Sequence, residues 1–141
     1  MLPKVSQFVI NHWALVGVFI AVFAFLILEE SRSQKAGGTK LTITMATHLM
    51  NHENAVILDL REANTFRDGH IINAKNFPLS EFERHADKLN AYRSQPVILV
   101  DAMGTKTNEI AIRLKKLGFE KINVLKGGMS AWRSASMPIV K

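Results

Sequence analysis

The feature that most constrains the fold is an apolar run near the N-terminus. Residues 8–28 read FVINHWALVGVFIAVFAFLIL, and from Trp13 onward every residue of this run is apolar or glycine. At 1.5 Å per residue, a helix of this length measures about 30 Å, the thickness of the hydrocarbon core of a bilayer. The run therefore predicts a membrane-spanning helix over residues 8–28, preceded by an N-terminal tail over residues 1–7.

A secretory signal peptide is the main alternative, because it also combines a basic start with an apolar run. The run is long, however, and the EESRSQK segment after Leu28 contains no small-x-small cleavage pattern, which favours an uncleaved anchor. Lys4 precedes the helix, whereas Arg32, Lys35 and Lys40 follow it. By the positive-inside rule, this asymmetry predicts a single-pass protein whose C-terminal side is cytoplasmic.

The segment after the apolar run has a different composition. Residues 29–40 read EESRSQKAGGTK, which is polar and contains a Gly-Gly pair, so we expect a flexible linker. A soluble domain then occupies residues 41–141. Asn11 and His12 lie at the start of the apolar run, where side chains reach the membrane interface, and Trp13 fits an aromatic belt. A functional intramembrane His12 is the less favoured interpretation.

The composition excludes several classes of function. The chain has 141 residues and no cysteine, which rules out disulfides, thiolate metal sites, a cysteine nucleophile and a persulfide carrier. The net charge is +6, but the lysines and arginines are spread along the chain and no basic run is interleaved with aromatic residues. Nucleic acid is therefore not an expected partner.

Beyond residue 40 the hydrophobic period alternates between that of a strand and that of a helix. This alternation predicts an α/β domain of three α/β/α layers around a mostly parallel sheet. The expected strands cover residues 41–44, 55–60, 74–78, 97–100 and 122–125. The expected helices begin at an N-cap Thr44, at residue 62, at a capping box of Ser80 and Glu83, near Thr107 with Gly118 as the C-cap, and at Met129.

One strand leads directly into a candidate site. Residues 97–107 read VILVDAMGTKT, in which a buried strand is followed by a short loop containing glycine and then by a helix. Ligands of open parallel sheets bind beyond the carboxyl ends of the strands, and Asp101 ends a central strand. Asp59 and Arg61 lie at the end of another buried strand and face the same rim. For these two residues we favour an organising role, in which Asp59 accepts loop N–H groups and Arg61 forms an ion pair.

These segments together resemble the rhodanese-like domain, over essentially the whole of residues 41–141. With the apolar helix, the chain is similar to the single-pass, YibN-type rhodanese-like proteins of Gram-negative bacteria, which implies the inner membrane. The matching segments are VILDLRE (56–62), Phe66, GHIINAKNFP (69–78), VILVDAMGTKT (97–107), LGF (117–119), NVLKGGMSAW (123–132) and Pro138.

The resemblance implies a five-stranded parallel sheet in the order 1-5-4-2-3 and an active loop patterned C-x-x-G-x-R, followed by Ser or Thr. In this chain Asp101 stands where the family has its cysteine, and Lys106 stands where it has arginine. A carboxylate cannot carry sulfane sulfur, so the resemblance implies a catalytically inactive domain. The degenerate active-site loop comprises Asp101, Ala102, Met103, Gly104, Thr105, Lys106 and Thr107.

Three interpretations of Asp101 remain open. Its carboxylate could fill the anion-binding cradle of backbone N–H groups itself, which we favour. It could instead turn outward and form a polar recognition surface with Lys106 and Thr107. It could also act as an aspartyl nucleophile, for example in phosphoryl transfer. The expected function is accordingly a membrane-bound adaptor with a protein partner, and a small anion at the loop is a further candidate ligand. The alternative is a sulfurtransferase-related or aspartate-based enzyme.

We expect no metal or other cofactor. His48 and His52 are four residues apart, but no third ligand is near them in the sequence. Met103 and Met129 are candidates for an apolar lip beside the loop, although a role in filling core space fits equally well. Trp132 is expected to anchor the last helix, and His70 to belong to a structural turn.

Overall fold

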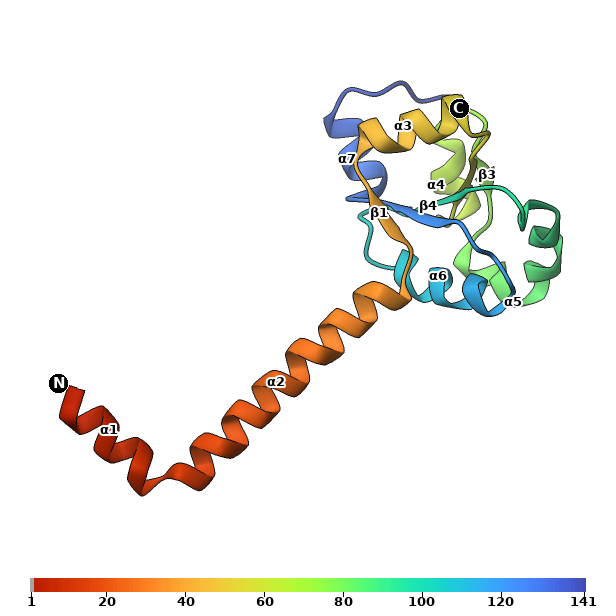
Figure 1. The fold of residues 1–141 in the computed structure, drawn as a ribbon. Helices are drawn as coiled ribbons and strands as arrows, with labels where there is room; N and C mark the ends of the chain where they lie inside the picture. The colour runs from red at the N-terminus through yellow and green to blue at the C-terminus, as the bar shows by residue number, and fades with distance from the viewer. Residues whose placement is uncertain (1) are drawn as a thin grey trace. The chain divides into compact units, whose positions relative to one another are not determined.

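The computed structural model describes residues 2–141, which divide into two compact units between Lys35 and Ala36. The first unit is helical, with α1 at Leu2–Asn11 and α2 at Trp13–Ala36 (Figure 1). Within α2, Trp13–Arg32 is long and apolar enough to cross a membrane, with a mean hydropathy of 2.1 and no buried residues.

The first unit differs in two ways from the sequence-based expectation. The helix expected over residues 8–28 is interrupted at His12, so residues 8–11 belong to α1. Residues 29–36 of the expected flexible linker continue α2, because Glu, Arg, Gln, Lys and Ala all favour helix. Of the expected N-terminal tail over residues 1–7, Met1 lies outside the described residues.

The second unit contains a five-stranded parallel sheet in the order β1-β5-β4-β2-β3, as the resemblance implied. Two strands match the predicted bounds completely, over residues 97–100 and 122–125. The strands are β1 (Thr39–Leu41), β2 (Val56–Asp59), β3 (Lys75–Asn76), β4 (Val97–Val100) and β5 (Ile122–Leu125).

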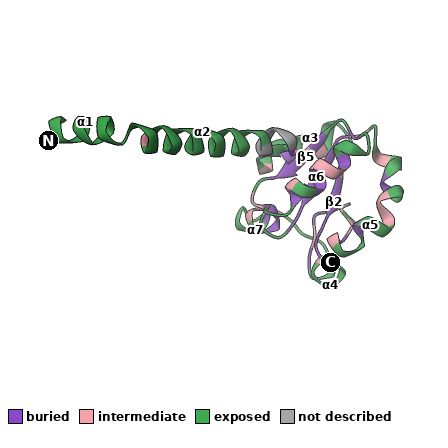
Figure 2. Ribbon diagram, turned by 90° about the horizontal axis from the view of Figure 1, so that it is seen from below, coloured by how far each residue is buried: buried purple, intermediate pink, exposed green. Residues whose placement is uncertain are grey.

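Helices cover both faces of the sheet, which gives the predicted three layers. On one face, Leu58 and Leu99 pack with α6 and the segment that contains α5. On the other face, Ile57 and Ile98 pack with α3 and α7. Figure 2 shows the buried residues concentrated in the strands. The helices are α3 (Ile43–His52), α4 (Ala63–Arg67), η1 (Leu79–Glu81), α5 (Phe82–His85), η2 (Ala86–Tyr92), α6 (Thr107–Lys116) and α7 (Gly128–Ser134).

Two predicted helix starts are wrong. The N-cap of α3 is Thr42 and not Thr44, because β1 begins at Thr39 and ends before Thr42, whose side chain accepts a hydrogen bond from the Met45 N–H. Ser80 caps no helix: its hydroxyl donates to the Glu62 carboxylate at 3.0 Å, and the chain there forms the 3₁₀ turn η1. A side chain can satisfy a distant acceptor instead of its local backbone, which local sequence does not reveal.

Candidate functional site

The loop between β4 and α6 is organised around the carboxylate of Asp101. This side chain is only 5% exposed. Its Oδ1 accepts a hydrogen bond from the Gly104 N–H, and its Oδ2 accepts one from the Lys106 N–H at 2.8 Å. Gly104 adopts a φ of +81°, which lets the loop fold back toward the carboxylate. The carboxylate therefore points inward and occupies the position between the loop N–H groups.

Helix α7 closes the other side of this loop. The Met129 N–H donates to the Asp101 carbonyl oxygen at 2.8 Å, and the Ser130 N–H donates to Ala102 at 2.9 Å. Gly128 has a φ of +57°, and a Cβ at this position would lie 2.4 Å from the Asp101 carbonyl oxygen. Only glycine permits this approach. The first turn of α7 thus holds the backbone at Asp101 in place.

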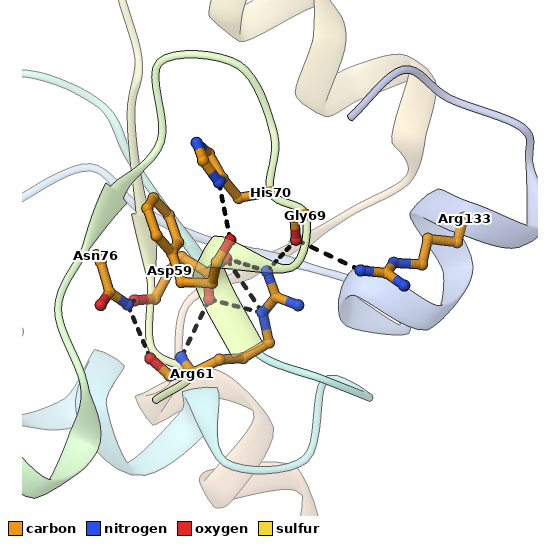
Figure 3. Close-up of polar contacts among 7 residues, drawn as sticks. Asp59, Arg61, Gly69, His70, Asn76 and Arg133 are labelled. Atoms are coloured by element: carbon orange, nitrogen blue, oxygen red, sulfur yellow. Dashed lines mark hydrogen bonds and ion pairs between the residues drawn. The ribbon is translucent and has the colours of Figure 1, made fainter. Parts of the chain in front are cut away.

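A buried ion pair lies at the carboxyl end of β2 (Figure 3). The Arg61 guanidinium donates from Nη2 to Asp59 Oδ2 at 2.7 Å and from Nε to Oδ1 at 2.9 Å. The Arg61 N–H also donates to Asp59 Oδ1 at 3.0 Å, and Asn76 donates to the carbonyl oxygens of both residues. The organising role that the sequence predicted for this pair is what the geometry shows.

The same guanidinium connects β2 to the turn that follows α4. Arg61 Nη2 donates to the Gly69 carbonyl oxygen at 2.9 Å, and Arg133 of α7 donates to the same oxygen at 3.4 Å (Figure 3). The His70 ring stacks on Phe66 with 3.8 Å between ring centroids, and His70 Nδ1 lies 2.9 Å from the Phe66 carbonyl oxygen. These contacts support the structural role expected for His70.

A cavity of about 360 Å³ opens beside the loop. Its walls are largely apolar, and Met103 is 68% exposed at its edge. The side chain of Lys106 is exposed and supplies a positive charge at the rim. A cavity of this kind suits an apolar group with a polar end. The lining residues are Leu60, Arg61, Glu62, Thr65, Leu79, Asp101, Ala102, Met103, Thr105 and Lys106.

The residues that the sequence placed at one rim have different environments in the structure. Arg61 and Asp101 line the same cavity. The Asp59 carboxylate is paired with the Arg61 guanidinium. Asp101 and Thr107 are buried, so they do not form the outward polar surface considered above, whereas Lys106 remains exposed.

Other candidates have roles in packing. Met129 is buried in the core and is not part of a lip, while Trp132 is buried and its Nε1 donates to the Pro138 carbonyl oxygen at 3.0 Å. Sequence reasoning missed the contact between Gly128 and Asp101, for which the Gly-Gly pair after β5 was the available signal. Among the described residues, no group of three or more metal-ligating side chains could hold an ion.

Comparison with known proteins identifies the fold and the family. The protein-family model of the rhodanese-like domain matches residues 42–135. The chain is 33% identical to YibN of Escherichia coli K12 over 141 residues, which cover 99% of each chain. It is 29% identical to the thiosulfate sulfurtransferase GlpE of Shewanella oneidensis over 99 residues, covering 68% of this chain and 93% of that one.

A solved structure shares the fold. The rhodanese-related protein from Thermoplasma volcanium superposes with a TM-score of 0.62 at 24% identity, covering 72% of this chain and 97% of that one. The family match extends from α3 to the C-cap of α7, and therefore includes β4, the Asp101 loop and the glycine pair that closes it. The chain belongs to the rhodanese-like domain family and is related to sulfurtransferases.

Proposed function

We propose that this chain is a membrane-anchored rhodanese-like domain that does not transfer sulfur and serves as a binding or adaptor module. The observation that carries the proposal is the position of the Asp101 carboxylate, which accepts hydrogen bonds from the N–H groups of Gly104 and Lys106. These donors would otherwise stabilise an anion bound at the loop. The side chain at this position thus occupies the place of a bound anion itself.

The chemistry of the chain supports an inactive domain. Sulfur transfer through a persulfide requires a thiol, and the sequence contains no cysteine. An aspartate-based transferase is less well supported, because both carboxylate oxygens of Asp101 already accept backbone hydrogen bonds and the side chain is buried. A small anion at the loop is not part of the proposal, since the carboxylate occupies that position.

The cavity beside the loop is the proposed partner site. Met103 presents an exposed apolar side chain, Leu60 and Leu79 form an apolar wall, and Lys106 provides a cation. Exposed methionine adapts to differently shaped apolar partners. The candidate span Trp13–Arg32 would hold this site at the inner membrane, and the basic residues after it favour a cytoplasmic domain.

The absence of sulfur transfer is tested with purified full-length chain in detergent. We expect no thiosulfate:cyanide sulfurtransferase activity in the wild type. Asp101→Cys is expected to fold and to give an active thiolate, because the thiol would face the same N–H donors. Its activity should be weak, because Lys106 lacks the bidentate geometry of arginine. A clear wild-type rate that persists in Asp101→Ala would contradict the proposal.

The partner site is tested by capture from detergent-solubilised inner membranes. Met103→Glu places a charge at the cavity edge and is expected to reduce partner recovery at least tenfold. Met45→Glu is the matched control, because Met45 is also exposed, at 50%, but lines a different concavity, beside α3. If both variants lose the same partner equally, or if neither variant loses it, the loop cavity is excluded as the partner site.

A further inference from the structure

The N-terminal helix α1 carries one narrow polar stripe on an otherwise apolar surface. Lys4, Gln7 and Asn11 are spaced by three and four residues, which places them on one face of the helix. The remaining polar side chain, Ser6, donates its hydroxyl to the Pro3 carbonyl oxygen at 3.0 Å, so its hydrogen-bonding group is satisfied within the helix. Only the stripe therefore requires water.

Apolar side chains surround this stripe and remain largely exposed, although the Phe8 ring also contacts the His12 ring, with 4.7 Å between the ring centroids. Val5 is 63% exposed and Phe8 is 60% exposed, and Val9 and Ile10 are also exposed. Four such side chains within one short helix would be unfavourable in water. Their exposure indicates that α1 contacts an apolar medium along most of its circumference.

The position of α1 in the chain indicates what this medium is. Asn11 ends α1, and the candidate membrane span begins two residues later at Trp13. If the span crosses the bilayer, the C-terminal end of α1 is held at the membrane surface. Trp13 is exposed at this junction, where an aromatic ring suits the boundary between headgroups and hydrocarbon.

The alternative of one long spanning helix conflicts with length and polarity. Placed end to end, α1 and α2 would measure about 50 Å, against about 30 Å of hydrocarbon. The span of Trp13–Arg32 already accounts for that thickness. An inserted α1 would also place Lys4, Gln7 and Asn11 where hydration is lost. The interruption at His12 provides a place for the chain to change direction.

We propose, on the basis of the membrane anchoring proposed above, that α1 is an interfacial helix that lies in the plane of the membrane. Its apolar side chains contact the acyl-chain boundary, and the Lys4–Gln7–Asn11 stripe faces water and lipid headgroups. The partner is the lipid surface itself. Because the stripe contains a single cation, binding depends on apolar burial and varies little with the fraction of anionic lipid.

The natural absence of cysteine permits a direct test with the full chain in lipid vesicles. Single cysteines introduced at positions 4–11 are spin-labelled, and the depth of each label is measured by collision with a lipid-soluble and a water-soluble relaxant. We expect depth to oscillate with a period of about 3.6 residues, shallow at 4, 7 and 11 and deepest near 9. A steady change of depth along the helix, or uniform exposure to water, would overturn the proposal.

Two controls separate this proposal from the membrane anchor. A label at Ala21, inside the span, reports on the anchor alone. If this label is not deep, the proposed membrane anchor is contradicted. If it is deep but the depth does not oscillate along α1, only the proposed interfacial helix is contradicted. In a chain labelled at Val5→Cys, the second substitution Val9→Lys is expected to release the label into water, and the stripe substitution Gln7→Lys to leave its depth unchanged. Equal effects of the two lysines would contradict the assigned faces. A deep position of the Val5→Cys label that is seen only in vesicles with anionic lipid would also contradict the proposal.

Discussion

Asp101 shows how one buried side chain organises the loop between β4 and α6. The carboxylate is buried and receives two backbone hydrogen bonds, so its charge is stabilised by the donors that surround it. The Asp59–Arg61 pair beside it is likewise buried, and its ionic groups satisfy each other. At the scale of single residues, the charged side chains of the site therefore find their hydrogen-bond partners within the domain.

A first prediction follows from the hydrogen bonds of the Asp101 carboxylate. Asp101→Ala removes the carboxylate and leaves the Gly104 and Lys106 N–H groups free to bind an external anion. We expect sulfate or phosphate to raise the Tm of the variant by several degrees, since ligand at ten times Kd contributes about 1.4 kcal/mol. The wild type should show no comparable shift. Thermal unfolding of full-length chain in detergent, with sodium chloride at equal ionic strength as the control, measures both.

An anion-induced shift of equal size in wild type and Asp101→Ala would mean that the anions bind elsewhere. No shift in a folded Asp101→Ala would mean that the cradle collapses once the carboxylate is removed. Either result would contradict the role of Asp101 as an internal anion.

At the scale of secondary structure elements, the site depends on the contact between the β4–α6 loop and the start of α7. Two α7 N–H groups satisfy the carbonyl oxygens of Asp101 and Ala102, and Arg133 of the same helix reaches the Gly69 turn. Helix α7 also packs Met129 and Trp132 into the core that includes Ile57 of β2 and Ile98 of β4. The helix therefore connects the core to the loop.

A prediction at this scale concerns the glycine at the start of α7. Gly128→Ala would place a Cβ 2.4 Å from the Asp101 carbonyl oxygen and impose a left-handed φ of +57° on alanine. We expect a loss of about 3 kcal/mol or more in the free energy of unfolding, measured by urea denaturation followed by circular dichroism. Ser130→Ala in the same helix, with an exposed side chain, is the control and should change it by less than about 0.5 kcal/mol. Similar stability of the two variants would contradict the close packing of loop and helix.

At the scale of the whole molecule, the two units differ in whether their apolar side chains are buried. The buried side chains of both core clusters belong to Ala36–Lys141, whereas the apolar side chains of the candidate span are exposed. The domain can therefore retain its core without the helices, while the helices require a medium other than water.

This difference predicts the behaviour of the full chain and of a fragment. Full-length protein should stay in the membrane pellet after carbonate extraction, and the fragment 36–141 should be a soluble, cooperatively folding protein. Release of the full chain into the aqueous phase would contradict the anchor. Orientation is measured separately with protease added to spheroplasts: we expect the domain to be protected, and its degradation would reverse the assigned orientation.

The sequence by itself determined the features that depend on local pattern. The apolar run VILV and the mostly apolar segment INVL predicted β4 and β5 with their observed bounds, and alternation of period predicted the α/β class. The absence of cysteine excluded persulfide chemistry without reference to any structure. These properties follow from composition and from periods of two and 3.6 residues, which are readable over a few neighbouring positions.

Only the tertiary structure decided how distant segments meet. The inward orientation of Asp101 depends on N–H groups positioned by a glycine in the left-handed region, and on Gly128, which approaches from the end of another strand. The pairing of Ser80 with Glu62 and the burial of Thr107 likewise depend on neighbours outside the local segment. Such contacts form between residues far apart in the chain, so the free energy that selects them arises only when the sheet and its helices pack together.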